Sequence, residues 1–179
     1  MRAVAYQGAP GAFGQAACRR FLPNWRPVPY PTFDAVAAAV AAGEAGRGML
    51  PIENVIAGPV PGVADLIESR DLIVSARHSL PVEIHLLAAP GVELSSLRRV
   101  ASHPVALKQC AGWLERNGLA PEPAINTAVA ARALAESRDP TLGVAASAAA
   151  ASAYGLAILA RSIQDRAGNI TVFAEIARG

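Results

Sequence analysis

The chain ends with "AGNITVFAEIARG", residues 167–179, and this stretch decides how the rest of the sequence is arranged. Its centre, "NITVF", alternates apolar and polar residues as a half-buried strand does. A final strand here either continues the second half of the chain or returns to the first half. A return makes two connections between two lobes, which is the arrangement of a hinged cleft, and it places Thr171 at the crossing.

Alternating strand and helix signals fill the first part of the chain. Extended segments are predicted at "RAVAY" (2–6), "RPVPY" (26–30) and "RGMLP" (47–51). A glycine-rich turn and a helix ending near Phe21 follow the first segment, and a helix capped by Thr32 and ended by Gly43 follows the second. Such alternation predicts mostly parallel sheets. The stretch "IENVIAGPVPGV" (52–63) is interpreted as a long functional loop.

The second lobe begins where two extended runs, separated near His78, cross from the first. It is predicted to contain a strand leading into a helix from Pro104 to Asn117, a capped helix at "NTAVAARALAES" (126–137) and a strand followed by a helix at "LGVAASAAAASAYG" (142–155). We therefore expect an α/β protein of two small lobes. The first lobe comprises residues 1–76 and 168–179, and the second comprises residues 77–167.

Composition narrows the class of protein. The 179 residues are 53% apolar and 17% charged, which is typical of one folded domain or two small lobes. Acidic and basic residues are interspersed, so nucleic acid is not an expected partner. Two cysteines, Cys18 and Cys110, lack metal-ligand spacing and predict buried thiols in a reducing compartment, the cytoplasm. We predict no signal peptide, and the uncharged stretch 144–160 is interpreted as a buried helix and a strand rather than a membrane span.

The chain lacks a Walker loop, a GxGxxG motif, a His/Cys cluster and a GxSxG motif. What remains are three strand-to-helix junctions with small or hydroxyl-bearing residues, at Gly11–Gly14, Ser102–Pro104 and Asn126–Ala128. Helix N-termini that converge at the carboxyl ends of parallel strands form a site for a small anion. Taken singly, each junction is better interpreted as an ordinary helix cap, and only the occurrence of three in one chain favours a site.

Six blocks of sequence, in this order and spacing, resemble the catalytic domain of prephenate dehydratase and its plant arogenate relatives. The blocks are "VAYQGAPGAF", "LPIENVIAG", "ASHPVALKQC", "NTAVAA", "YGLAILARSIQD" and "NITVF", and the resemblance covers essentially the whole chain. It implies two α/β lobes of periplasmic-binding-protein-like (type II) topology with a cleft between them, in a homodimer or homotetramer. The family usually adds a C-terminal ACT domain that binds phenylalanine, and none is expected in these 179 residues.

The resemblance also implies a reaction. Prephenate, or arogenate, loses carbon dioxide and water to give phenylpyruvate, or phenylalanine, with neither a metal nor a cofactor. The family's essential hydroxyl falls on Thr171, which we expect to hydrogen-bond the leaving oxygen because a threonine is too weak an acid to protonate it fully. Phe173 is expected to form an aromatic wall. The other expected substrate-binding residues are Gly11, Ala12, Phe13, Asn54, Ser102, His103, Asn126, Thr127 and Ala128.

Four positions depart from the family pattern. Val172 stands where the family has the arginine of a Thr-Arg-Phe triplet, and an apolar side chain cannot replace that charge. Gly14 and Val55 stand where serines are common, and Ile84 where a histidine is common. These losses keep open an alternative function: a cleft-binding protein, or a divergent enzyme that decarboxylates prephenate without aromatising it.

Several residues keep two interpretations. Glu53 and Asn54 either support the loop through hydrogen bonds or take part in catalysis. His103 either binds substrate or caps its helix. Cys110 is expected to pack rather than react, and His78 and His85 are interpreted as structural residues.

Overall fold

The computed structural model describes residues 2–179, which divide into two compact units. The first unit comprises residues 2–9, 13–82 and 169–179, and the second comprises residues 10–12 and 83–168. The boundary between them lies after Val82 rather than after Ala76. The predicted interruption near His78 is wrong, because the strand that contains it pairs with the final strand as far as Pro81.

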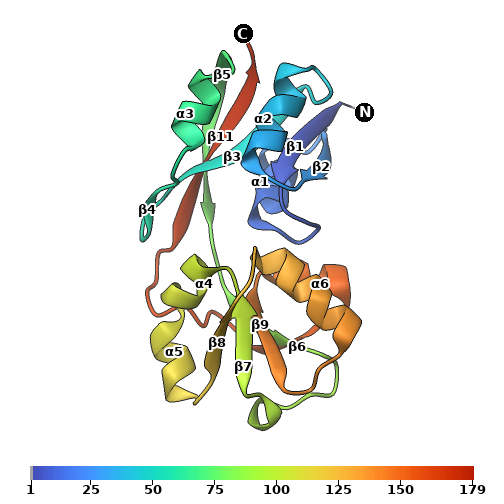
Figure 1. Cartoon of the computed structure of the whole chain (residues 1–179), viewed down its shortest axis with the longest axis vertical. Helices are drawn as coiled ribbons and strands as arrows, with labels where there is room; N and C mark the ends of the chain where they lie inside the picture. The colour runs from blue at the N-terminus through green and yellow to red at the C-terminus, as the bar shows by residue number, and fades with distance from the viewer. Residues whose placement is uncertain (1) are drawn as a thin grey trace. The chain divides into compact units, whose positions relative to one another are not determined.

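Six strands form the sheet of the first unit: β1 (Ala3–Gln7), β2 (Arg26–Tyr30), β3 (Arg47–Asn54), β4 (Gly58–Pro59), β5 (Leu72–Pro81) and β11 (Ile170–Arg178). Their order is β2-β1-β3-β11-β5, with β4 paired to β3 (Figure 1). The final strand therefore returns to the first unit, where it runs antiparallel between β3 and β5. The predicted long loop at 52–63 is wrong in part, because its first half is the β3–β4 hairpin.

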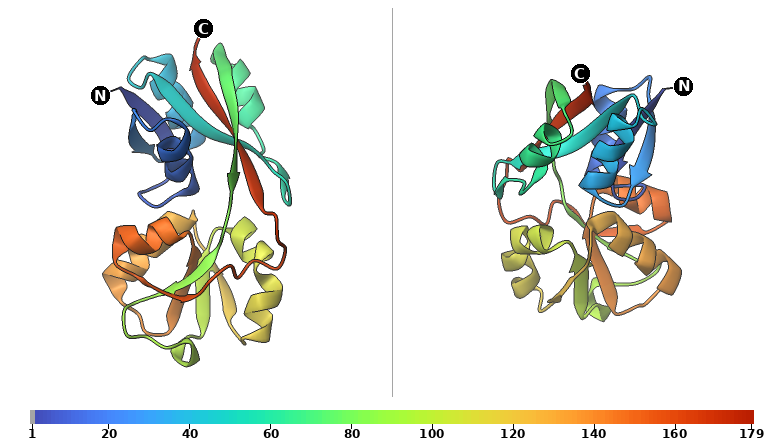
Figure 2. Two further views of the ribbon diagram at one scale, coloured as in Figure 1. Left: turned by 180° about the vertical axis from the view of Figure 1, so that it is seen from behind. Right: turned by 45° about the horizontal axis from the view of Figure 1, so that its top comes forward.

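Three helices cover this sheet: α1 (Phe13–Phe21), α2 (Phe33–Ala41) and α3 (Val63–Glu68). The chain passes from β1 to β2 in one direction across the sheet and from β2 to β3 in the other. Right-handed crossovers then put α1 and α2 on opposite faces, as the front and rear views show (Figures 1 and 2). Thr32 caps α2 as predicted, because its Oγ1 accepts the N–H of Ala35 at 3.0 Å.

The core of the first unit depends on small residues. The buried face of α2 is made of valine and alanine, which bring the helix close to the sheet. A Cβ at Gly48 of β3 would lie 2.8 Å from Ile176 Cγ1 and 3.0 Å from Val40 Cγ2. Glycine is thus required at this position for α2, β3 and β11 to pack at their observed spacing.

The sheet of the second unit has five strands: β6 (His85–Ala88), β7 (Arg99–Ser102), β8 (Ala120–Pro123), β9 (Leu142–Ala146) and β10 (Ala157–Ala160). Their order is β10-β6-β9-β7-β8. The helices are α4 (Pro104–Gln109), α5 (Ala111–Arg116), α6 (Thr127–Ser137) and α7 (Ala148–Tyr154), with a 3₁₀ turn η1 (Leu94–Ser96). The single helix predicted from Pro104 to Asn117 is wrong, because it breaks at Cys110, where φ is −110°.

Both sheets are mixed, so the prediction of mostly parallel sheets is wrong. Only β1 with β2 and β3, and β7 with β8 and β9, run parallel. The antiparallel pairs involve β4, β6, β10 and β11.

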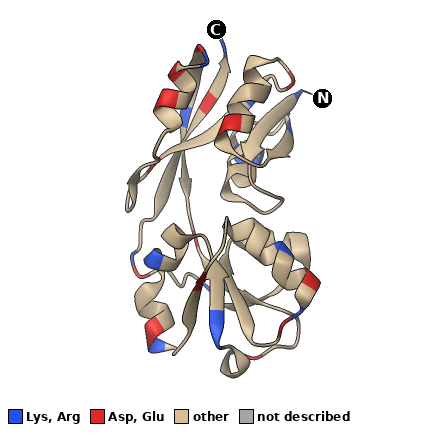
Figure 3. Cartoon of the chain, in the orientation of Figure 1, with Lys and Arg blue, Asp and Glu red and all other residues tan. Residues whose placement is uncertain are grey.

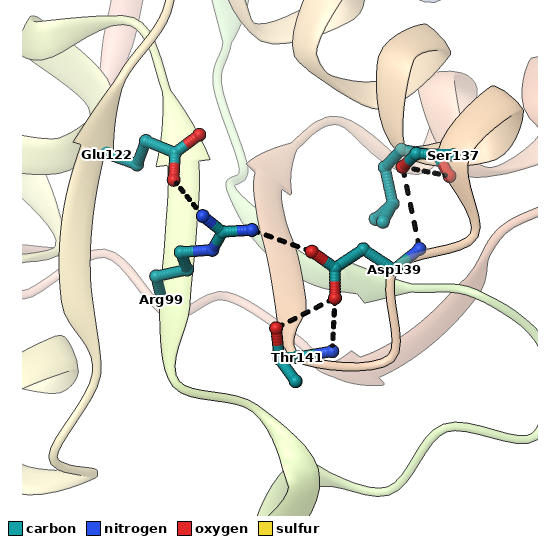
Figure 4. Close-up of polar contacts among 6 residues, drawn as sticks. Arg99, Glu122, Ser137, Asp139 and Thr141 are labelled. Carbon is teal, nitrogen blue, oxygen red and sulfur yellow. Dashed lines mark hydrogen bonds and ion pairs between the residues drawn. The ribbon is translucent and has the colours of Figure 1, made fainter.

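An ion-pair network joins three segments of the second unit (Figure 4). The guanidinium of Arg99 on β7 lies 2.6 Å from Asp139 Oδ2 and 3.1 Å from Glu122 Oε2. Asp139 also accepts the main-chain N–H and the hydroxyl of Thr141. Strands β7 and β8 are thereby tied to the turn between α6 and β9. Elsewhere along both units, charges of both signs are interspersed (Figure 3).

Within residues 2–179, no helix is both long enough and apolar enough to cross a membrane. Cys18 and Cys110 are free and buried, as predicted. Burial raises the pKa of each thiol to about 12, so both are protonated at neutral pH.

Candidate functional site

The first-unit part of the predicted site centres on Thr171 near the start of β11. Thr171 pairs with Asn54 at the end of β3 and with Leu80 on β5. The side-chain nitrogen Nδ2 of Asn54 donates to Thr171 Oγ1 at 3.0 Å. Since a hydroxyl has one proton and two lone pairs, accepting this bond leaves the proton of Thr171 available for another acceptor.

The orientation of the Asn54 amide is decided by its other hydrogen bonds. Its Oδ1 accepts the main-chain N–H groups of Ile56 at 3.0 Å and Ala57 at 2.9 Å, which closes the β3–β4 turn. Main-chain nitrogens can only donate, so the oxygen of the amide must face them and the nitrogen must face Thr171. The direction of the Asn54–Thr171 bond therefore follows from the turn.

The side-chain nitrogen of Asn54, like its side-chain oxygen, uses all of its hydrogen-bonding capacity. Besides Thr171, it donates to Asn169 Oδ1 at 2.8 Å and lies 3.2 Å from the carbonyl of Ile170. An amide has two hydrogens and two lone pairs, and all four are in use. Of its two interpretations, support of the loop matches these contacts, and a part for Asn54 in catalysis or substrate binding stays a prediction.

The residues that flank Thr171 differ in exposure. Phe173 is only 2% exposed, so its ring packs inside the molecule, and this burial argues against an aromatic wall there. Between Val172 and Phe173 the register with β3 shifts by one residue. Val172 is half-buried and pairs with Glu53 and Ser79. Phe13 is half-buried at the start of α1.

The second-unit part of the predicted site lies where helices begin. α4, α6 and α7 follow β7, β8 and β9, which are parallel neighbours in the order β9-β7-β8. Their N-termini therefore lie at the same end of the sheet, where partial positive charge gathers. The predicted junction at Gly11–Gly14 is split, because Gly11 and Ala12 belong to the second unit and α1 belongs to the first.

Ser102 and His103 both serve local structure. Ser102 is fully buried, and its hydroxyl donates to the carbonyl of Ala145 on β9 at 2.6 Å. His103 caps α4, because its Nδ1 accepts the N–H of Val105 at 3.2 Å. Burial lowers the pKa of His103, which favours the neutral ring that this acceptor role needs. The contact seen for His103 is thus the capping one.

Asn126 caps α6 by accepting the N–H of Val129 on its Oδ1 at 2.8 Å. Thr127 and Ala128 form the first turn of this helix, and Ala128 is buried. Asn126 therefore holds the start of α6 in place through its Oδ1, and the free main-chain N–H groups of the first turn are suited to an anion.

Ser147 was missed by the sequence reasoning, although a serine between a strand and an alanine run is a typical N-cap signal. Its Oγ accepts the N–H of Ala150 at 3.0 Å and donates to the carbonyl of Gly11 at 2.7 Å. A Cβ at Gly11 would lie 2.5 Å from Ala150 Cα, and its φ is +87°. Packing against α7 therefore explains Gly11, and Ala12 beside it is buried.

The other three residues that depart from the family pattern differ from one another in their surroundings. Val55 is 55% exposed in the β3–β4 turn, whereas Ile84 is 1% exposed. A Cβ at Gly14 would be 3.4 Å from Tyr6 Cβ, an ordinary contact distance. A serine would therefore fit at residue 14 and at residue 55 without disturbing the fold.

The two remaining histidines have structural partners. His78 Nε2 lies 3.0 Å from Glu175 Oε2, and the ring stacks on Phe21 at 4.5 Å. His85 Nδ1 accepts the N–H of Ser162 at 3.0 Å. Among residues 2–179, no three His, Cys, Asp or Glu side chains are grouped so as to hold a metal ion. That the two sets of site residues form one site stays a prediction.

Comparisons with known proteins give a consistent result. The family model for prephenate dehydratase matches residues 4–179. Arogenate dehydratase 5, chloroplastic, of Arabidopsis thaliana is 42% identical over 179 residues, covering 98% of this chain and 42% of that protein. The bifunctional N-acyl-homoserine lactone acylase/prephenate dehydratase of Komagataeibacter europaeus is 40% identical over 173 residues, covering 96% of this chain and 61% of that protein.

Solved structures give the fold. Prephenate dehydratase from Arthrobacter aurescens in complex with L-Phe is 29% identical with a TM-score of 0.91, covering 99% of this chain and 60% of that one. A nutrient binding protein from Burkholderia cenocepacia, 11% identical with a TM-score of 0.52, is similar in fold alone over 99% of this chain and 85% of that one. These likenesses confirm the predicted two-lobed, type II α/β fold class. The chain spans about two fifths of the plant arogenate dehydratase.

Proposed function

The chain belongs to the prephenate dehydratase family, and on that premise we propose that it converts prephenate to phenylpyruvate, or arogenate to phenylalanine. The observation that carries the proposal is the hydroxyl of Thr171, which accepts a hydrogen bond from Asn54 at 3.0 Å and so keeps its proton for a substrate oxygen. The proposed activity is that of a hydro-lyase in phenylalanine biosynthesis.

The reaction does not require a strong acid from the protein. The ring carboxylate leaves as carbon dioxide, its bonding electrons enter the ring, and the ring hydroxyl leaves with the electron pair of its C–O bond and takes up a proton from solvent to become water. Aromatisation drives this step, so a directed hydrogen bond from Thr171 to the leaving oxygen is sufficient assistance. Free main-chain N–H groups at the starts of α6 and α7 are suited to the substrate carboxylates. The start of α4 offers fewer donors, because Pro104 has no N–H and the N–H of Val105 is bonded to His103.

Val172 supports the alternative function. A valine at this position removes the family's arginine, and with it a charged group that can hold an anionic substrate. The alternative is a protein that binds prephenate, or decarboxylates it without aromatisation.

The experiment is an assay of purified protein with prephenate and, separately, with arogenate. Phenylpyruvate is followed by the ultraviolet absorbance of its enolate, and phenylalanine by chromatography. Ligand binding is measured in parallel as thermal stabilisation, which should reach about 2.7 kcal/mol near a hundredfold excess over Kd. Turnover supports the dehydratase, stabilisation without an aromatic product supports the alternative, and neither result supports a third function.

Similarity to the Komagataeibacter protein supports a second candidate, hydrolysis of an acyl-homoserine lactone. Burial raises the pKa of both thiols to about 12, which argues against a cysteine nucleophile for such an acylase. Release of fatty acid from an N-acyl-homoserine lactone by the same preparation would support this second activity.

We also propose self-association, as a homodimer or homotetramer, in the cytoplasm. Self-association is supported by the alanine residues in the cores of the two units, because an alanine buries little apolar area. The cytoplasm is supported by the two free thiols. Light scattering at micromolar concentration tests the first proposal, and fractionation of cells that make the protein tests the second.

A further inference from the structure

We propose that Asn169 is a positioning residue that aims the hydroxyl of Thr171 through the side chain of Asn54. This inference rests on the proposed function, because it concerns how the hydroxyl is presented to a leaving oxygen. The Oδ1 atom of Asn169 accepts the shortest of the hydrogen bonds donated by Asn54 Nδ2, at 2.8 Å. The other two are 3.0 Å, to Thr171 Oγ1, and 3.2 Å, to the carbonyl of Ile170.

Asn169 is well placed for this role because it is held on two sides. It is 3% exposed, and its main-chain carbonyl accepts the N–H of Val82 at 2.8 Å, just beyond β5. Its Oδ1 is therefore a fixed point and not the end of a mobile surface side chain. Residues 169 and 171 lie two apart along an extended segment, so both side chains project to the same side.

The two hydrogens of Asn54 Nδ2 need separate acceptors. Asn169 takes one of them, so the other is directed at Thr171 Oγ1. Without Asn169, the first hydrogen has only Thr171 Oγ1 and the carbonyl of Ile170 as acceptors. The hydrogen bond to Thr171 Oγ1 then no longer has a single geometry, and the hydroxyl proton no longer points in one direction. Because the Asn54 amide accepts two N–H groups and donates two bonds, Asn169 also takes part in polarising it.

The test is a double-mutant cycle measured with whichever substrate the protein turns over. Asn169→Ala should lower kcat by roughly 10- to 100-fold with KM little changed, because a small misplacement of a reacting group is that costly. In a Thr171→Val background, Asn169→Ala should change kcat less than about threefold, because the hydroxyl it aims is absent. Equal losses in both backgrounds overturn the proposal in favour of a purely structural role.

Two further variants sharpen the cycle. Asn169→Asp keeps an acceptor oxygen for Asn54 and should retain more of kcat than Asn169→Ala does. Asn117→Ala is the matched control, because Asn117 is exposed and its amide donates only to the carbonyl of Trp113. It should leave kcat and KM unchanged.

A readout independent of activity separates this proposal from the proposed function. In the parent, both side-chain amide hydrogens of Asn54 are bonded, and they should exchange slowly with solvent in NMR spectra. Asn169→Ala should speed that exchange and shift both resonances. An unchanged amide overturns the positioning role even if the protein turns over prephenate, whereas a changed amide in a protein without turnover supports the geometry and contradicts only the function.

Discussion

Asn54 Nδ2 lies 3.0 Å from Thr171 Oγ1, across the antiparallel pair of β3 and β11. The two residues are 117 positions apart in the sequence. The amide nitrogen donates and the hydroxyl oxygen accepts, which leaves the hydroxyl proton as the free end of the chain of hydrogen bonds.

Thr171→Val removes that proton while keeping the β-branched shape of the side chain. If the hydroxyl acts on the leaving oxygen in the transition state, kcat should fall by roughly 10² to 10⁴-fold, with ligand affinity little changed. The free energy of unfolding should fall by only about 1 kcal/mol, because Asn54 keeps its bonds to Asn169 and the Ile170 carbonyl. Steady-state kinetics and urea unfolding measure the two effects.

Thr141→Val is the control for this substitution. It makes the same chemical change in the second unit, where the hydroxyl of Thr141 donates to Asp139 at 2.7 Å. It should leave kcat unchanged. Turnover within about tenfold of the parent for Thr171→Val would make Thr171 an ordinary strand residue.

Val172→Arg restores the family triplet, and we expect it to raise kcat/KM by roughly tenfold, because an arginine forms charge-assisted bonds to a carboxylate. Val172→Gln has comparable length without the charge and should have no such effect. Val172 pairs with Glu53, which offers the new arginine a competing partner. A higher melting temperature with no change in kcat/KM would mean that the arginine binds Glu53 instead of substrate.

Gly11→Ala should destabilise the second unit, because the added Cβ would lie 2.5 Å from the main-chain Cα of Ala150. We expect a loss of about 2 to 4 kcal/mol in the free energy of unfolding, the sum of overpacking and backbone strain. Gly118→Ala is the matched control, with a φ of +64° and no atom within 4 Å, and should cost only about 1 kcal/mol. Equal losses for the two variants would exclude the contact with α7 as the cause.

Glu175 makes the stability of the first unit dependent on pH. Burial raises the pKa of Glu175, but hydrogen bonds from His78 and Arg47, both at 3.0 Å, outweigh burial and hold it below the ordinary value of 4.5. A carboxylate with a lowered pKa adds stability above its unfolded-state pKa, and this contribution is lost as the pH falls through the folded-state pKa.

Glu175→Gln should therefore be less stable than the parent by about 1 to 2 kcal/mol at neutral pH. The difference should stay constant down to about pH 5 and shrink below the ordinary glutamate pKa. Urea unfolding of both proteins between about pH 3 and 7 measures it. A difference that grew on acidification would contradict the lowered pKa of Glu175.

Much of the fold was predictable because its signals are local. Thr32 and Asn126 bond main-chain N–H groups three residues away, so their helices could be located from the sequence alone. The strand at "NITVF" was equally evident from its alternation. By contrast, the break at Cys110 and the antiparallel direction of β6 and β10 carry no strong local signal, and both were missed.

The sequence by itself determined the family and the two-lobed α/β class, because these depend on residue order and periodicity, whereas the role of Thr171 stays a prediction. Only the tertiary structure decided which groups the candidate site residues contact. Asn54 has all four amide positions occupied, by the turn that follows it and by residues 115 to 117 positions away, and Gly11 accepts a bond from a serine 136 positions away. Such contacts depend on which strands become neighbours, and that pairing is set by packing across the whole unit rather than by any short stretch of the chain.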